Sequence, residues 1–272
     1  MRPMNTPKSP FLMHRVAGRG EPLLLLNGAL MSMAAWQPLM PRLEPSWKVI
    51  RCDFRGQFFS PGEQEPHLDA HVRDVLALLD HLALPRVHIA GVSFGSLAAL
   101  RMAARHPERV ASIAAITSSD YIRPEAAWRL LGPVQEALLA RDGGRLFNVS
   151  LPMFGDDYLA REKETIELQR QWITNLPEIW HRGVGQIMAS VEEIDLRQDL
   201  PQVRCPVQVI SAEQDKIFPP AEGESLASSV QNGRFAVVPG AGHNLVVEKP
   251  QSVAELLAAF FSRQSIRSGG FP

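Results

Sequence analysis

Cysteine is scarce in this chain of 272 residues, which contains only Cys52 and Cys205. Two cysteines so far apart in sequence form neither a closely spaced metal-binding motif nor a disulfide framework. Their scarcity argues against a zinc-stabilised domain and against a small disulfide-rich domain. A location in the reducing cytoplasm fits this composition best.

An excess of charge of either sign is also lacking. The chain has 28 lysine and arginine residues against 29 aspartate and glutamate residues. No basic stripe argues for a nucleic-acid partner, and no polybasic amphipathic helix argues for a membrane surface. We therefore expect a small-molecule substrate as the partner, with no nucleic acid and no membrane involved. The sequence leaves a homodimer open.

Long apolar runs are missing as well. The longest run is far too short to span a bilayer. Residues 1–20 also lack the continuous apolar core of a signal peptide. We find no internal repeat and no low-complexity segment, so solenoid and fibrous architectures are not expected.

Short apolar runs are what the chain does have, and 45% of its residues are hydrophobic. They alternate with stretches of helical periodicity, which predicts parallel βαβ units in a sheet covered on both faces. The fold class is therefore α/β, with a doubly wound, mostly parallel sheet. We expect strands at 11–16, 23–27, 48–52, 86–92, 110–117, 206–212 and 235–240, and helices at 68–82, 96–105 and 250–262.

Residues 120–195 break this alternation. Helical patterns near 125–141, 157–174 and 178–193 follow one another with no good strand between them. An all-helical insertion between two strands of a parallel sheet is most simply a cap over the carboxyl edge of that sheet. The predicted domains are therefore a core of residues 1–119 and 196–264 and a helical cap of residues 120–195. A flexible tail of residues 265–272 follows.

Ser93 stands between two glycines, in Gly91-Val92-Ser93-Phe94-Gly95, where an apolar strand runs into an alanine- and leucine-rich helix. A tight strand-to-helix turn lifts one side chain above the sheet, and small residues two positions before and after it avoid clashes. This context predicts Ser93 as a nucleophile. The N–H of Phe94, in the first turn of the helix, would point at an oxyanion.

A serine nucleophile needs a general base to accept its proton. Eight histidines compete for this role. Seven of them lie in predicted strands, on surface helices or in loops with no other functional signal. His243 differs because it lies in a glycine-rich loop between the strand at 235–240 and the last helix. A loop of that composition can hold an imidazole over the edge of the sheet.

The base in turn needs an acid that orients its ring. Asp215 lies in the loop after the strand at 206–212, and the chain order Ser93, Asp215, His243 is the one expected of this fold. Glu213, two residues earlier, is an alternative acid. Asp120 is another, because the acid can also follow the preceding strand.

At this point the sequence resembles the α/β-hydrolase fold family, and in particular its lid-bearing esterases and enol-lactonases. The resemblance runs from about residue 11 to 262 and includes "LLNGALMSMAAWQPLMPRL", "VIRCDFRG", "DVLALLDHLAL" and "RHPERV" beside the serine motif. It implies the same nucleophile, acid and base. It also implies a second oxyanion donor, the N–H of Ala29, because in the family that donor follows a His-Gly pair after the first strand of the central sheet.

Two departures from the family pattern stand out. Asn27 occupies the place of the usual histidine, as it does in enol-lactone hydrolases and in transferases of 3-hydroxyacyl chains. The second departure is "DFRGQFFS", where the family usually has Arg-Gly-His-Gly before a serine. Phe58 and Phe59 in this stretch replace small or polar residues. They predict either ordinary packing or an apolar wall at the pocket mouth.

The expected reaction is hydrolysis of a carboxylic ester, thioester or lactone through an acyl-enzyme, with no metal or organic cofactor. Three rivals stay open. An acyltransferase and a carbon–carbon bond hydrolase could use the same three residues, and a non-enzymatic protein could bind a small ligand on the same fold.

The cap carries many large apolar residues, which suggest a substrate with an apolar part. The same residues would be needed merely to pack the cap, so this interpretation has a structural alternative. The predicted pocket residues are Asn27, Leu30, Phe58, Phe59, Trp128, Phe147, Met153, Phe154, Trp180 and Met188.

Overall fold

The computed structural model describes residues 12–58, 60, 67–122, 124–191 and 194–266. Within these residues a seven-stranded sheet has the strand order β1-β3-β2-β4-β5-β6-β7. β1 pairs antiparallel with β3, and the other neighbouring strands pair in parallel. This confirms the predicted fold class. The strands are His14–Gly18 (β1), Glu21–Leu26 (β2), Trp47–Cys52 (β3), Val87–Val92 (β4), Val110–Ile116 (β5), Val207–Ala212 (β6) and Gly233–Val238 (β7).

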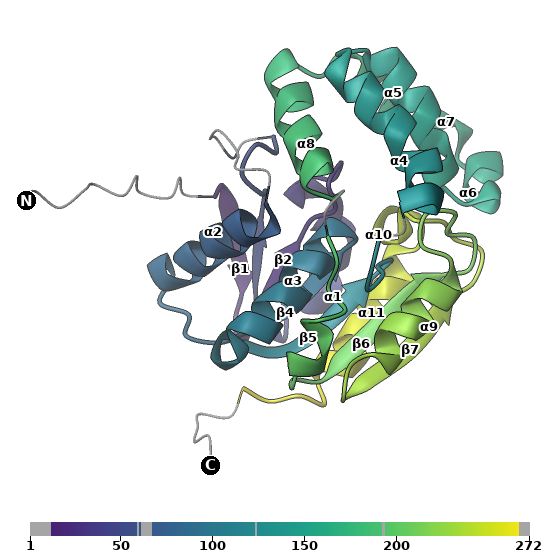
Figure 1. Cartoon of the computed structure of the whole chain (residues 1–272). Coiled ribbons are helices and arrows are strands. Elements are labelled where there is room, and N and C mark those ends of the chain that lie inside the picture. Colours follow the sequence, from purple (N-terminus) through teal and green to yellow (C-terminus); the bar gives the residue numbers. More distant parts are fainter. Residues whose placement is uncertain (1–11, 59, 61–66, 123, 192–193, 267–272) are drawn as a thin grey trace, which may run out of the picture.

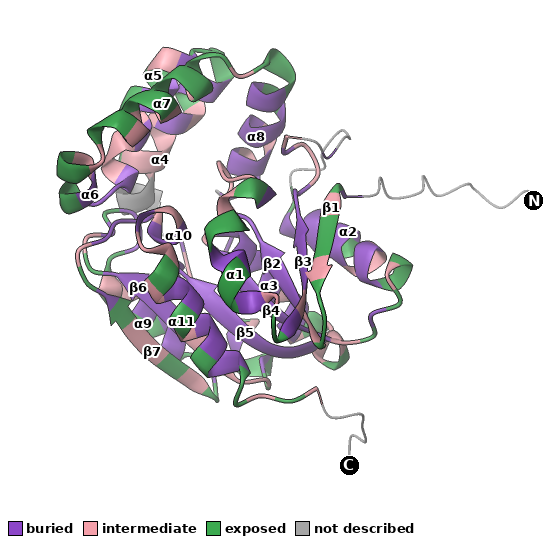
Figure 2. Cartoon of the chain, turned by 180° about the vertical axis from the view of Figure 1, so that it is seen from behind, coloured by how far each residue is buried: buried purple, intermediate pink, exposed green. Residues whose placement is uncertain are grey.

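The central strands are buried on both faces, as their continuous apolar runs predict. Every residue of β4 and of β5 is buried, whereas β7 at the edge of the sheet is mostly half-exposed or exposed (Figure 2). Successive side chains of β2 point to opposite faces. Leu24 and Leu26 pack in one apolar cluster, and Leu23 and Leu25 pack in the other. The sheet therefore separates two cores.

Helices cover both faces of the sheet (Figure 1). Apolar side chains of α2, α3 and α9 belong to one core, and those of η1, α1 and α11 belong to the other. In the part of the chain that the structure describes, no helix is long and apolar enough to cross a membrane. These elements and the short ones beside them are η1 (Met33–Leu39), α1 (Met40–Leu43), α2 (Leu68–His81), α3 (Phe94–Arg105), η2 (Pro107–Arg109), η4 (Leu200–Gln202), α9 (Pro220–Ser228), α10 (Leu245–Glu248) and α11 (Pro250–Phe261).

A group of helices stands between β5 and β6 in the chain and gathers beyond one edge of the sheet (Figure 1). The helical pattern predicted over 157–174 is two helices, because Glu162 leaves the helical conformation with φ −100° and ψ 40°. The elements of this cap are α4 (Pro124–Leu139), α5 (Gly143–Ser150), η3 (Leu151–Met153), α6 (Asp156–Arg161), α7 (Lys163–Thr174) and α8 (Glu178–Val191).

The C-terminal segment after α11 returns to the start of β2. The backbone N–H of Ile266 donates a hydrogen bond of 3.0 Å to the carboxylate of Glu21. Of the predicted flexible tail, the structure describes residues 265 and 266, and residues 267–272 lie outside the described residues.

Candidate active site

Ser93 occupies the turn between β4 and α3, at the carboxyl end of a central strand. Its backbone has φ 49° and ψ −113°, a conformation that non-glycine residues rarely adopt. Its N–H donates to the carbonyl of Ile116 on β5 at 2.9 Å, and its own carbonyl accepts from Ser96 and Leu97 of α3. These bonds to a buried strand and a helix hold the strained residue in place.

The glycines on either side of Ser93 are required by close backbone approach. A Cβ atom on Gly91 would lie 2.5 Å from the backbone of Gly95 and Ser96. A Cβ atom on Gly95 would lie 2.4 Å from the carbonyl oxygen of Leu26. Real Cβ atoms essentially never come so close to backbone. The turn that raises Ser93 therefore depends on glycine at both positions.

His243 and Asp215 come together from the loops after β7 and β6. Nδ1 of His243 and Oδ2 of Asp215 are 2.9 Å apart, and both residues are buried. The other carboxylate oxygen, Oδ1, accepts hydrogen bonds from the backbone N–H groups of Ile217 and Phe218 at 2.8 and 2.9 Å. The carboxylate is thus fixed in orientation. It assigns the ring proton to Nδ1 and leaves Nε2 as the acceptor.

The two alternative acids have other partners. Glu213 is exposed, and its Oε2 accepts a hydrogen bond of 2.8 Å from the N–H of Gly240. Asp120 is half-buried, with Oδ1 at 3.4 Å from the hydroxyl of Ser119. Of the three carboxylates considered, Asp215 is the one that the structure hydrogen-bonds to His243.

Two backbone N–H groups are candidates for holding an oxyanion. Phe94 begins α3, and the first N–H groups of a helix have no acceptor within it. The loop after β2 approaches the serine, because a Cβ atom on Gly28 would lie 3.8 Å from Cβ of Ser93. Phe94 and Ala29 line the same cavity as Ser93. The structure thus brings two candidate amide donors to the cavity that Ser93 lines.

Asn27 does not line this cavity, contrary to the prediction from the sequence. Its side chain is completely buried in a network of polar groups beneath the loop. Nδ2 donates to Asp53 at 2.9 Å and to Gln57 at 3.4 Å, and Oδ1 accepts from the indole of Trp36 at 2.9 Å. The amide prefers this position because each of its polar atoms finds a partner there.

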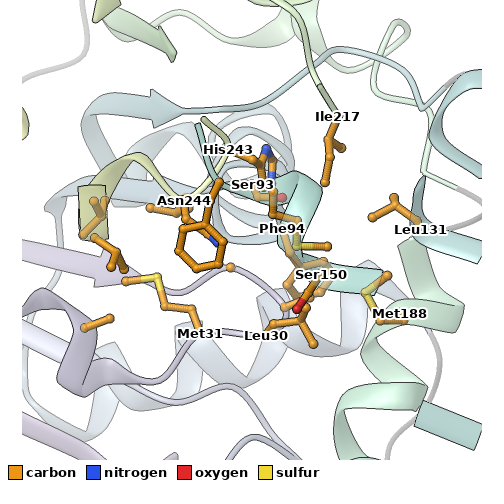
Figure 3. Close-up of a pocket in the computed structure, with 18 of the residues that line it drawn as sticks. Leu30, Met31, Ser93, Phe94, Leu131, Ser150, Met188, Ile217, His243 and Asn244 are labelled. Atoms are coloured by element: carbon orange, nitrogen blue, oxygen red, sulfur yellow. The ribbon is translucent and has the colours of Figure 1, made fainter. Parts of the chain in front are cut away.

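The cavity has a volume of about 260 Å³ and lies between the sheet and the cap. Ser93, Phe94, His243 and Met188 of the cap all contribute to its wall (Figure 3). Most of its lining is apolar, and none of the described lining residues is aspartate, glutamate, lysine or arginine. The described polar side chains that join Ser93 and His243 in the wall are Ser32, Ser150, Gln169 and Asn244.

The structure places some of the predicted pocket residues at this cavity. Leu30 of the core and Met153, Phe154 and Met188 of the cap line it. Four others are described but do not line it, namely Phe58, Trp128, Phe147 and Trp180. Phe59 lies outside the described residues.

The four that do not line the cavity are held elsewhere by packing. The ring of Phe58 lies 5.4 Å from that of Trp172 and 5.5 Å from that of Trp180. Trp128 lies over Gly132 of its own helix, and Phe147 is buried within the cap. Their apolar character thus stabilises the cap, which was the structural alternative.

Several residues that line the cavity were not predicted from the sequence. Trp172 is the largest of them, and it is 51% exposed, on a helix with no buried residue. Others lie two to four residues after Asp215 or His243 in the sequence, and that proximity was a usable signal. The missed apolar side chains are Met31, Ala35, Val92, Leu97, Ile122, Leu131, Trp172, Ile173, Val191, Ile217, Phe218, Val246 and Val247.

The two cysteines and the candidate metal ligands were considered as a second reactive centre. Burial raises the pKa of the Cys205 thiol to about 12 and that of Cys52 still further, which disfavours the reactive thiolate. Within the described ranges, no group of three or more histidine, cysteine, aspartate or glutamate residues could hold a metal ion.

Comparisons with known proteins agree with this fold. Residues 21–250 match a family model described as the alpha/beta hydrolase fold. A protein of Caulobacter sp. (strain K31), named provisionally as the carbamate hydrolase RutD, is 25% identical over 252 residues, which is 90% of this chain and 92% of that protein. The pimeloyl-acyl-carrier protein methyl ester esterase of Aeromonas hydrophila is 26% identical over 251 residues, which is 89% of this chain and 96% of that enzyme.

A solved structure resembles the chain over a similar length. The crystal structure of the enol-lactonase from Burkholderia xenovorans LB400 has a TM-score of 0.82 and 25% sequence identity, and it covers 92% of this chain and 96% of that one. These proteins are named for cleaving different bonds. The comparisons therefore agree on hydrolysis more closely than on a substrate.

Proposed function

The chain belongs to the α/β hydrolase fold family, and we propose that it is a serine hydrolase that cleaves a carboxylic ester, thioester or lactone through an acyl-enzyme. One observation carries the proposal. Ser93, in its strained turn, lines the same cavity as His243, whose Nδ1 is hydrogen-bonded to Asp215. This arrangement supports Ser93 as the nucleophile, His243 as the base and Asp215 as the orienting acid of an acyl transfer.

In the proposed reaction, Oγ of Ser93 attacks the substrate carbonyl carbon while Nε2 of His243 takes the hydroxyl proton. The carbonyl π electrons move to oxygen, and the N–H groups of Ala29 and Phe94 stabilise the oxyanion. Asp215 stabilises the imidazolium that forms. The intermediate collapses, His243 protonates the leaving alcohol or thiol, and a water activated by the same histidine then releases the acid.

The cavity supports an uncharged, apolar acyl group as part of the substrate. Its described wall is built mostly from leucine, isoleucine, valine, methionine and aromatic side chains and contains no aspartate, glutamate, lysine or arginine. Burying an unpaired carboxylate there would cost several kcal/mol. Cap residues line the cavity that holds Ser93 and exclude part of the solvent from it. A drier site strengthens the electrostatic stabilisation of an oxyanion.

Labelling with a fluorophosphonate tests the nucleophile. The probe should modify Ser93 of the native protein, and Ser93→Ala should abolish labelling while the circular dichroism spectrum stays native. We expect turnover to fall about a thousandfold or more, as deletions of a catalytic serine do. Ser228→Ala is the control, because its hydroxyl is exposed on α9 and bonds only within that helix. Labelling of another serine, or full turnover by Ser93→Ala, would contradict the proposal.

A substrate panel tests the reaction class. p-Nitrophenyl esters, acyl thioesters and small lactones would each be incubated with the enzyme, and the released acid measured. Release of acid within at least one class is expected. An acyl group recovered on an added alcohol or thiol in preference to water would instead identify an acyltransferase.

A further inference from the structure

Gln57 belongs to "DFRGQFFS", the second departure from the family pattern, where it stands at the position of the histidine in Arg-Gly-His-Gly. It lies directly behind the loop that carries the proposed oxyanion donor. Its side chain is completely buried. Nε2 donates hydrogen bonds to the carbonyl oxygens of Gly28 at 2.8 Å and Ala29 at 2.9 Å. Oε1 accepts from the N–H of Phe54 at 2.9 Å and from Nδ2 of Asn27 at 3.4 Å. Both amide hydrogens and the amide oxygen are therefore engaged.

The bond to Gly28 has a geometric consequence for Ala29. The carbonyl of Gly28 and the N–H of Ala29 belong to one peptide unit, and that unit is trans. In a trans peptide the C=O and N–H bonds lie in one nearly rigid plane and point in opposite directions within it. A donor that holds the carbonyl on the Gln57 side of the loop therefore aims the N–H of Ala29 toward the opposite side.

The opposite side of the loop is the catalytic cavity. Gly28 and Ala29 both line it, and the backbone of Gly28 approaches Ser93. The N–H of Met31 also donates to the carbonyl of Gly28, at 3.1 Å, so that oxygen is held by a backbone donor and a side-chain donor. Of these two, the side-chain donor is the one that a substitution can remove.

We propose that Gln57 is a positioning residue that fixes the Gly28–Ala29 peptide so that the Ala29 N–H is preorganised to stabilise the oxyanion. The inference rests on the proposed function of Ser93 and Ala29. Gln57 touches no reacting atom. It acts by removing the rotation that this peptide would otherwise need at the moment when charge develops on the substrate oxygen.

The amide is specifically suited to this position. A carboxylate in its place would present only acceptors to two carbonyl oxygens, and a thioether would donate nothing. Asn27 completes the arrangement, because its Nδ2 bridges Gln57 and Asp53. The two residues that depart from the family pattern thus hydrogen-bond to each other beneath one loop.

The test compares Gln57→Met and Gln57→Glu with the native enzyme on one p-nitrophenyl ester. Removing an oxyanion donor outright lowers kcat by about 10²–10³. Misaiming one of two donors should lower kcat by about 10- to 100-fold, with KM changed less than about threefold. Gln208→Met is the matched control, because Gln208 also donates to two backbone carbonyls, on β6 and β7, away from the cavity. It should keep native kinetics.

A transition-state analogue separates positioning from general loosening. A trifluoromethyl ketone forms a tetrahedral oxyanion adduct with the serine, whereas an amide analogue of the ester binds only as a ground state. For each Gln57 variant, the inhibition constant of the ketone should rise by the same factor as kcat/KM falls. The inhibition constant of the amide should stay within about threefold. Equal losses for both inhibitors, or no loss for the ketone, would overturn the inference.

The native enzyme provides an independent check if a variant does not fold. In a crystal structure of the native protein with the ketone, the adduct oxygen should lie 2.7–3.1 Å from N of Ala29, with Gln57 still on the Gly28 carbonyl. An oxygen held by other donors would refute the role. Failure of the proposed function itself has a different signature, because Ser93 would then be neither labelled by a fluorophosphonate nor bonded to the ketone.

Discussion

His71 should make the protein sensitive to mild acid. It lies on α2 and is 1% exposed, and among the residues that the structure describes neither ring nitrogen has a hydrogen-bond partner. Its ring packs edge-on against those of Phe54 and Phe94, with centroids 5.5 and 5.1 Å away. Burial lowers the pKa of His71 from 6.5 to about 4, although the charge of Asp74 opposes this shift and that of Arg55 adds to it.

The direction of the effect follows from proton linkage. The unfolded chain binds the His71 proton below pH 6.5, whereas the folded protein resists it until about pH 4. The contribution of neutral His71 to the free energy of unfolding is therefore complete above pH 6.5 and is lost as the pH falls from 6.5 toward about 4. For a pKa difference of this size, linkage predicts a loss of about 2 kcal/mol in the free energy of unfolding between pH 7 and pH 5.

His71→Phe removes the titration and keeps a ring between the two phenylalanines. Urea denaturation followed by far-UV circular dichroism at pH 7, 6 and 5 gives the free energies of unfolding by linear extrapolation. Other groups also titrate in this range, so the measured quantity is the difference between variant and native protein. That difference should shift in favour of the variant by about 2 kcal/mol from pH 7 to pH 5.

Any constant packing penalty of the phenylalanine cancels in this comparison. His67→Phe is the control, because His67 is exposed at the start of the same helix and the substitution should not change the acid dependence. If His71→Phe and the native protein lose equal stability between pH 7 and pH 5, the ring of His71 is not held neutral by burial and the reasoning is wrong.

Three further outcomes can be checked. The kcat/KM for esters of a neutral acyl chain should be at least about tenfold higher than for esters of an equally long chain that ends in a carboxylate, because the cavity would bury that charge without a partner. A preference for the carboxylate would refute the apolar wall. Gly95→Ala, whose Cβ would meet the Leu26 carbonyl at 2.4 Å, should lower the unfolding free energy by several kcal/mol in urea titrations. Burial raises the pKa of Glu248, so the free energy of unfolding of the native protein, relative to that of Glu248→Gln, should decrease as the pH rises from 4.5 toward that raised pKa. An increase of this difference with pH would contradict the prediction.

The sheet and the serine turn were predictable because their signals are local. A strand buried on both faces needs a nearly continuous apolar run, and β4 and β5 are such runs apart from His88 and Ser112. The strained turn at Ser93 requires glycine at two fixed offsets, and a Cβ at either one would strike backbone. The loops after the strands could likewise be predicted, and the sequence therefore identified Asp215 and His243 as candidates.

The cap was predictable in outline but not in its inward face. The sequence alone does not distinguish Trp128, Trp172 and Trp180, because each is a tryptophan in a predicted helical segment. In the structure Trp172 lines the cavity at half exposure, while Trp180 is buried against Phe58. Helical periodicity identifies an apolar face, but the packing of one helix on another decides whether that face meets protein or an empty cavity. That decision depends on contacts far apart in the sequence.

The departures at positions 27 and 57 show why such residues mislead when each is considered alone. From the sequence, Asn27 was predicted to be a pocket residue. The structure instead buries it against Gln57, which lies thirty positions away in the chain. A buried donor or acceptor without a partner costs about 1–3 kcal/mol, so buried amides must complement one another as a set. Changing one of them alone leaves its partner unsatisfied. Departures from a family pattern are therefore better interpreted in pairs that can hydrogen-bond than as separate changes of specificity, and here the pair supports the loop that carries the proposed oxyanion donor.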